Sequence, residues 1–268
     1  LRLLKLVNTL LDFSRIEADR MQAIYEPTDL AALTTDLASV FRSAIEKAGL
    51  QLVVDCPPLS EPVYVDQDMW EKIVLNLLSN AFKFTQKGQI TVRQRLAGDN
   101  IELQVEDTGT GIPESELGNV FKRFHRIEGT QGRTHEGTGI GLALVQELAK
   151  LHGGSLRLQS VYGQGSTFTI SIPRGKHHLP TDRIASARTF TSTSIRADAF
   201  LEEALRWLPE DLHDVESSEI HEIKGPRPRV LLADDNADMR EYVRKLLCTQ
   251  YEVVAVADGE AALAAADE

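Results

Sequence analysis

Alternating glycines between residues 137 and 142 constrain this chain more than any other feature of its sequence. The segment GTGIGL places Gly137, Gly139 and Gly141 directly before an apolar-periodic run that ends at Leu151. Glycines so spaced let the backbone turn sharply and approach a ligand closely, and the helix that follows offers unpaired N–H groups and a positive dipole end. The pattern predicts a phosphate-gripping loop. Since GxG patterns also occur in ordinary tight turns, that interpretation needs support from elsewhere in the chain.

Charge and cysteine content exclude several classes of protein. The net charge of -11 argues against a nucleic-acid partner, which would require a basic face. Cys56 and Cys248 lie far apart without a CxxC partner, so we expect no disulfide framework or zinc site, as is typical of a reducing compartment. No apolar run is long enough to span a bilayer. We therefore expect a cytoplasmic segment without membrane contact, although the full-length protein could be anchored upstream.

The sequence divides into four expected segments. Residues 1–25 carry a wide apolar helical stripe, which fits either one helix of a bundle or an amphipathic helix lying on the next domain. Residues 26–174 alternate helical and strand patterns, and residues 175–228 form a Ser/Thr-rich, then acidic linker. Residues 229–268 begin a strand–helix–strand unit. Because Leu1 begins within a helical pattern and the chain stops in another, we interpret it as part of a longer protein.

A helix beginning at Asp68, with Glu71 as capping-box partner, carries three polar residues on one face. Asn76, Asn80 and Lys83 are spaced four and then three residues apart. They are explained either by an exposed polar face or by ligand binding, because an amide oxygen can bind Mg²⁺ and an ammonium can meet phosphate oxygens.

The strands expected at residues 90–96 and 101–105 form a hairpin, and the second leads into the turn DTGTGIP. Asp107 either caps this turn or accepts a hydrogen bond from an exocyclic amine. A short helix is expected from Pro113 through Phe124, with apolar core anchors, and residues 125–136 are expected to form a mobile flap over the phosphate site.

Paired acids follow the first strand of the last segment. Asp234 and Asp235 come directly after the strand expected at residues 230–233, ahead of a helix at residues 238–248 and a second strand at residues 251–257. Helix capping explains one carboxylate more readily than two, whereas a hard cation uses both.

The motifs, taken in order, resemble those of sensor histidine kinases, whose catalytic domain belongs to the GHKL ATPase superfamily. The resemblance covers residues 1–174 through NLLSNAFKF, DTGTGIP, FKRFHR, GTGIGLALV and LHGG. Residues from Val230 are similar to a response-regulator receiver domain, so the chain looks like part of a hybrid histidine kinase. The implied fold is an α+β two-layer sandwich, preceded by a bundle helix and followed by the start of an α/β doubly wound receiver domain. The implied partners are a second copy, through the bundle, and the chain's own or a separate receiver domain.

The resemblance implies that ATP and Mg²⁺ are the cofactors. Asn80 would ligate Mg²⁺, Lys83 would contact the triphosphate and Arg126 would approach the γ-phosphate. Asn76 falls where the superfamily places a catalytic polar residue or a general base, and Asp107 would bind the adenine amine. The remaining implied positions are Gly109 and Gly111 in the pocket, Phe121 and Phe124 beneath the lid, Gly137, Thr138, Gly139, Gly141 and Leu142 in the glycine loop, and Asp234 and Asp235 as receiver Mg²⁺ ligands.

The implied activity is phosphoryl transfer from ATP to a histidine on a bundle helix that this chain lacks, and then to a receiver aspartate. We expect the chain to be inactive in cis for that reason. A nucleotide-hydrolysing clamp needs a base such as Glu, and the neutral amide of Asn76 is a poor base. A non-catalytic ATP-binding coupler is the other alternative, although the intact glycines and asparagines argue against degeneracy.

Overall fold

The computed structural model describes residues 21–127, 132–133, 139–185, 228–233 and 251–266, with helical positions at 11, 14, 16, 240, 243–244 and 247 and a turn at 248. They belong to two compact units, one within residues 1–214 and one within residues 215–268. Most of residues 1–20, most of the expected flap and both of the paired acids lie outside the described residues. Of the helical segment expected at residues 1–25, the end at residues 21–25 is not helical.

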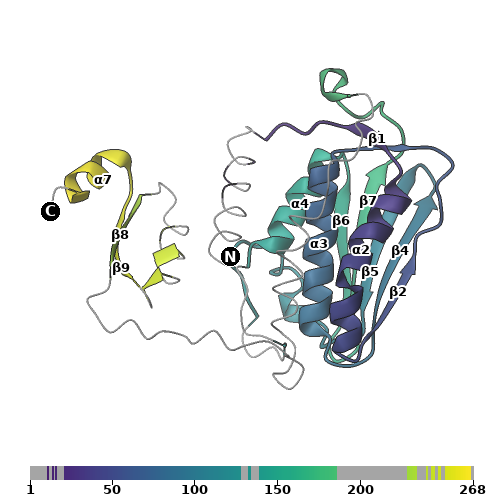
Figure 1. Ribbon diagram of the computed structural model, residues 1–268, viewed down its shortest axis with the longest axis horizontal. Coiled ribbons are helices and arrows are strands. Elements are labelled where there is room, and N and C mark those ends of the chain that lie inside the picture. Colours follow the sequence, from purple (N-terminus) through teal and green to yellow (C-terminus); the bar gives the residue numbers. More distant parts are fainter. Residues whose placement is uncertain are drawn as a thin grey trace. The chain divides into compact units, whose positions relative to one another are not determined.

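A five-stranded mixed sheet forms one layer of the larger unit (Figure 1). Its order is β2-β4-β5-β7-β6, and β2 pairs parallel with β4 while the other neighbours are antiparallel. A parallel pair needs a long crossover, which β3 and helix α3 supply between β2 and β4. The strand bounds are β2 Gln51–Asp55, β4 Gln89–Ala97, β5 Asn100–Asp107, β6 Ser155–Val161 and β7 Gly165–Pro173.

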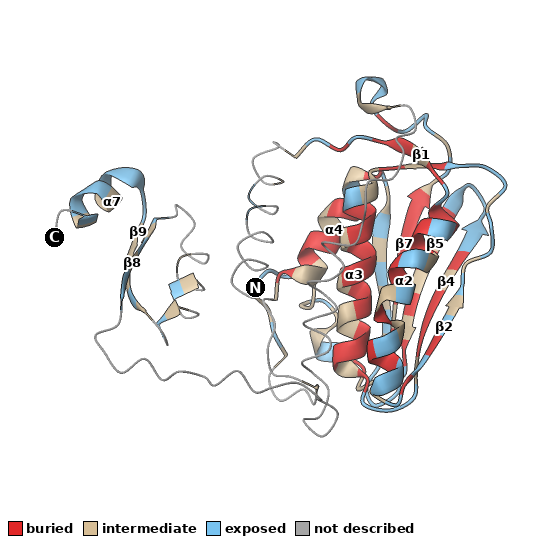
Figure 2. Ribbon diagram, in the orientation of Figure 1, coloured by how far each residue is buried: buried red, intermediate tan, exposed pale blue. Residues whose placement is uncertain are grey.

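In the described part of this unit, helices α2, α3 and α4 cover one face of the sheet (Figure 1). They span Leu30–Lys47, Gln67–Phe84 and Gly141–Leu151. The sheet face that the helices cover is largely buried (Figure 2). Alternate strand residues on this face, such as Val92, Leu103 and Ile170, are 0% exposed. The opposite sheet face carries ion pairs, among them Arg157 with Glu102. One apolar and one charged sheet face is the signature of a two-layer packing. The predicted α+β sandwich is therefore confirmed.

The N-cap of helix α3 lies two residues earlier in the chain than the sequence pattern predicted. Asp66, not Asp68, is its N-cap, and its Oδ1 accepts a hydrogen bond from the Met69 backbone N–H at 3.0 Å. Glu71 is buried at 3% exposure instead of sitting at the helix start. The predicted Asp68–Glu71 capping box is thus wrong, because Asp66 in an extended conformation already satisfies the third helical N–H.

A buried polar chain links α2, α3 and β4. Trp70 Nε1 donates to Thr34 Oγ1 at 3.1 Å, and the same hydroxyl donates to Gln94 Oε1 at 3.1 Å. Trp70, Thr34 and Gln94 all have zero exposed area. Since buried polar groups need partners, Thr34 fixes the relative placement of the two helices and the sheet.

The larger unit continues beyond residue 174, where a linker was expected. Leu179 is 5% exposed, and the 3₁₀ helix η2 at Thr181–Arg183 follows it. Tyr25 N–H then donates to the Arg183 carbonyl, and Ala185 N–H donates to the Tyr25 carbonyl, both at 2.9 Å. Residues up to 185 therefore pack with the domain and pair with the segment that enters it, just before the small sheet of β1 (Glu26–Thr28) and β3 (Val63–Val65).

The smaller unit contains two parallel strands, β8 (Arg229–Ala233) and β9 (Glu252–Val256), followed by helix α7 (Gly259–Ala266). Residues 240, 243–244 and 247 between the strands are helical. The strand, helix and strand predicted from residue 230 onward are confirmed at these positions.

Candidate functional site

The polar face of α3 meets the glycine segment at Asn76. The Asn76 Nδ2 group donates to the Lys72 carbonyl one turn earlier at 2.7 Å. A Cβ added to Gly141 would lie 2.9 Å from Asn76 Oδ1, closer than ordinary packing allows. The structure therefore brings the start of α4 against the Asn76 position, two motifs that are far apart in the sequence.

Asn80 and Lys83 occupy the last turns of the same helix. Asn80 is half-buried and Lys83 is 9% exposed, with its Nζ 5.0 Å from the centre of the Phe84 ring. A lysine that covers an aromatic face keeps its cation at a defined place. This part of α3 presents an amide and an ammonium one turn apart.

Asp107 ends β5 and is 5% exposed. Its Oδ1 accepts a hydrogen bond from the Gly109 N–H at 2.8 Å. Burial raises the pKa of Asp107 from its ordinary value of 3.8 to about 6, although the backbone N–H groups of Gly109 and Ser166 act in the opposite direction. The group is a buried carboxylate at neutral pH, which is a strong acceptor for an N–H donor.

Two glycines allow the turn after Asp107 to pack directly against neighbouring elements. A Cβ on Gly109 would lie 2.3 Å from the Phe84 carbonyl oxygen, and the next residue, Thr110, donates its N–H to that oxygen at 3.1 Å. Gly111 has φ +63°, and a Cβ there would lie 2.1 Å from the Val161 carbonyl oxygen. Only glycine fits either place, so the turn is held against the end of α3 and the end of β6.

The segment after this turn differs from the predicted helix at 113–124. Only Glu114–Glu116 form a short 3₁₀ helix, η1, and turns follow it. Phe121 packs against the core as expected, but Phe124 has φ 59°, the one positive φ of a non-glycine residue in the described part of the chain. The helix prediction is wrong after Glu116, and the left-handed backbone of Phe124 could not belong to a right-handed helix.

Phe124 and Gly139 hold each other in place. Phe124 N–H donates to the Gly139 carbonyl at 3.0 Å, and a Cβ on Gly139, whose φ is +69°, would lie 2.7 Å from the Phe124 carbonyl carbon. A left-handed bulky residue needs such support from its surroundings. The second glycine of the loop is therefore required by a close backbone contact.

The other predicted site residues are less informative. Arg126 is exposed, and Leu142 is partly buried against the core. Gly137, Thr138, Asp234 and Asp235 lie outside the described residues.

Sequence reasoning missed one residue of this region. Arg133 packs its guanidinium 5.0 Å from the Phe82 ring and donates to carbonyl groups at the end of α3. A single arginine in a polar, glycine-containing segment carries no signal of these tertiary partners.

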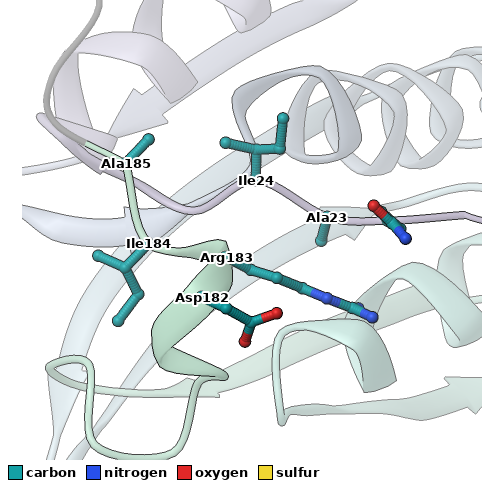
Figure 3. Close-up of a pocket in the computed structure, with 7 residues that line it drawn as sticks. Ala23, Ile24, Asp182, Arg183, Ile184 and Ala185 are labelled. Carbon is teal, nitrogen blue, oxygen red and sulfur yellow. The ribbon is translucent and has the colours of Figure 1, made fainter.

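An open pocket of about 280 Å³ lies elsewhere, where the chain enters and leaves the domain. Figure 3 shows Asp182 and Arg183 of η2 beside the segment that carries Ala23 and Ile24. None of its lining residues is a predicted site residue, so it is separate from the site around α3.

Comparison with known proteins agrees with this arrangement. Residues 65–176 match the family described as "Histidine kinase-, DNA gyrase B-, and HSP90-like ATPase". The chain is 33% identical over 267 residues to the sensor histidine kinase TmoS of Ectopseudomonas mendocina, covering 97% of this chain and 26% of TmoS. These matches support a histidine kinase catalytic domain in this segment.

Further histidine kinases resemble this catalytic domain. The circadian input-output histidine kinase CikA of Synechococcus elongatus is 41% identical over 175 residues, covering 64% of this chain and 23% of CikA. The Acinetobacter baumannii histidine kinase AdeS is similar in structure, with a TM-score of 0.54 and 26% identity over 64% of this chain and 78% of that one. The chain spans about a quarter of the length of TmoS and CikA, and only 9% of the hybrid signal transduction histidine kinase B of Dictyostelium discoideum.

A full-length structure shares the fold. ShkA in complex with AMPPNP aligns with a TM-score of 0.57 and 21% identity, covering 99% of this chain and 74% of that chain. Within the described residues, no helix is both long and apolar enough to cross a membrane.

Proposed function

We propose that this chain supplies the ATP-dependent kinase activity of a two-component phosphorelay. The observation that supports this most is the placement of Asp107. Its turn is fixed by Gly109 and Thr110 against the Phe84 carbonyl, at the end of the helix that carries Asn80 and Lys83. The carboxylate that would bind adenine and the side chains that would bind the phosphates are therefore both held at the end of α3.

The donor set fits Mg²⁺–ATP. The buried Asp107 carboxylate would accept a hydrogen bond from the adenine amine, and the Asn80 amide oxygen suits a hard cation. Lys83 and Arg126 would neutralise phosphate charge, which is the main protein contribution to phosphoryl transfer. Bound ATP supplies the phosphoryl group. Gly137, Thr138 and Gly139, ahead of Gly141 and Leu142, would complete the phosphate side.

Asn76 supports transfer over hydrolysis. A hydrolytic site needs a base to activate water, and the Asn76 amide is neutral and held by the Lys72 carbonyl. We infer that the acceptor is a histidine on a separate bundle helix and that phosphate then passes to a receiver aspartate. Asp234 and Asp235 would bind Mg²⁺ in the receiver, a bundle would make the full-length protein a homodimer, and the domain would act in the cytoplasm.

The test is transfer of labelled phosphate from Mg²⁺–ATP to a supplied helical bundle domain bearing an acceptor histidine. We expect transfer by the wild-type chain and its near-complete loss in Asn80→Asp and Gly139→Ala. Gly118→Ala is the matched control, because a Cβ there meets nothing within 4 Å. Unchanged transfer in both site variants would refute the site assignment. Nucleotide binding without any transfer would favour the non-catalytic coupler.

A further inference from the structure

Helix α3 ends at Phe84 without a glycine cap. Its C-cap, Thr85, has an extended backbone, and the next residue is Gln86 rather than a glycine that could turn the chain back. Thr85 N–H and Oγ1 both donate to the Ala81 carbonyl, at 3.1 and 2.7 Å. The later carbonyls therefore need donors from other parts of the chain, because the last turn of a helix leaves them unpaired.

Arg133 supplies most of those donors. Its Nε donates to the Phe82 and Thr85 carbonyls at 3.2 and 3.0 Å, and an Nη donates to the Gln86 carbonyl at 3.2 Å. Its backbone N–H donates to the Lys83 carbonyl at 2.9 Å. A planar guanidinium with five donors can serve several carbonyls at once, which an ammonium on a flexible stem cannot do.

The remaining carbonyl of this turn, that of Phe84, is bonded to a different segment of the site. Phe84 O accepts from Thr110 N–H, in the turn that follows Asp107. The end of α3 is thus shared between Arg133 and the Asp107 turn. Asn80 and Lys83 lie on the same turns, so any movement of the helix end would displace them relative to Asp107.

The positive charge of Arg133 strengthens its contact with the end of α3. The guanidinium lies at the negative end of the α3 dipole and over the face of Phe82, two places where a cation is stabilised. Partial burial lowers the pKa of Arg133, yet an arginine remains charged at neutral pH.

We propose that Arg133 is a positioning residue for nucleotide binding, an inference that rests on the function proposed above. By capping α3 it holds the turn that carries Asn80 and Lys83 at a fixed distance from Asp107.

The experiment measures the affinity of purified variants for Mg²⁺–AMP-PNP, well below their melting temperatures. We expect Arg133→Met, which keeps an apolar side chain over Phe82, to bind about tenfold more weakly. Arg133→Lys should recover part of the loss, because it restores the charge but not the fork. Arg157→Met is the control, since Arg157 forms an exposed ion pair with Glu102, and it should bind as the wild type does.

Amide hydrogen exchange separates positioning from general stability. In Arg133→Met without nucleotide, exchange should accelerate in residues 81–86 and stay unchanged in β5 and β7. Equal affinity of Arg133→Met and the wild type would overturn the inference, as would exchange that accelerates uniformly across the domain. Failure of the wild-type chain to bind AMP-PNP would instead refute the proposed function.

Discussion

Gly141 meets helix α3 at the side chain of Asn76, so closely that a Cβ on Gly141 would lie 2.9 Å from Asn76 Oδ1. Asn76 has little freedom to retreat, because its Nδ2 is bonded to the Lys72 carbonyl at 2.7 Å. The contact sets the distance between the start of α4 and the polar face of α3. It explains why a glycine is needed at the first position of a helix, where other residues would favour helix formation.

Gly141→Ala should therefore weaken nucleotide binding by pushing α4 away from Asn76, even though alanine is the better helix former. We expect about a tenfold loss of affinity for Mg²⁺–AMP-PNP, equivalent to ~1.4 kcal/mol. Gly118→Ala adds the same methyl group in open space and should bind as the wild type does. Equal affinities of the two variants would show that the Asn76 contact is dispensable.

Asp107 should cost the protein stability at neutral pH. Its folded-state pKa of about 6 exceeds the ordinary 3.8, so the folded chain holds this proton more tightly than the unfolded chain does. The contribution of this group to the free energy of unfolding falls as pH rises from about 4 to about 6, by ~3 kcal/mol in total. The side chain in Asp107→Asn does not titrate, so the free energy of unfolding of this variant does not fall for that reason.

The checkable quantity is the difference in unfolding free energy between Asp107→Asn and the wild type, measured in urea at two pH values. We expect this difference to favour the variant by ~2 kcal/mol more at pH 7.5 than at pH 4.5. Any constant cost of the lost hydrogen bond cancels in that comparison. A difference that does not change with pH would contradict a raised pKa.

The same titration should control ATP binding. The ionised Asp107 accepts a hydrogen bond from the adenine amine more strongly than the protonated group does, so affinity should fall as pH drops through about 6. Calorimetric titrations with ATP from pH 5 to pH 8 should show this step in the wild type and not in Asp107→Asn. The variant also corrects for protonation of ATP itself, and parallel curves would count against the assignment.

Thr34→Val should destabilise the fold and leave nucleotide affinity unchanged. The substitution removes the hydroxyl that pairs with both Trp70 Nε1 and Gln94 Oε1, which are buried. Two orphaned polar groups should lower the free energy of unfolding by ~2–4 kcal/mol. In the control Thr35→Val, the lost hydroxyl is part-buried and donates to the Ala31 carbonyl one turn earlier in α2, and the loss should be under ~1 kcal/mol. Similar losses in the two variants would remove the special role of Thr34.

Much of the fold was predictable because its signals are local. The strand patterns expected at residues 90–96 and 101–105 correspond to the β4–β5 hairpin, and those expected at residues 230–233 and 251–257 correspond to β8 and β9. The error at Asp68 has a local cause as well, since Asp66 and Asp68 are both good N-cap residues and Glu71, three residues after Asp68, completes a capping-box pattern for the wrong one.

The features that sequence reasoning missed depend on tertiary partners. Arg133 caps a helix some 50 positions away in the chain, and Tyr25 pairs with Arg183 and Ala185 after the chain has crossed the whole domain. Phe124 adopts a left-handed conformation that no residue type in its neighbourhood announces. Such contacts have no periodicity, so composition and spacing cannot reveal them.

The proposed function depends most on recognition of the adenine amine by Asp107. The most direct test compares the affinity of the wild-type chain for ATP and for purine riboside triphosphate, which carries hydrogen in place of the amine, at pH 7.5 with Mg²⁺. A hydrogen bond to a buried carboxylate should favour ATP by about tenfold to a hundredfold, and Asp107→Asn should lose most of that preference. Equal affinities of the wild-type chain for the two nucleotides would contradict the claim.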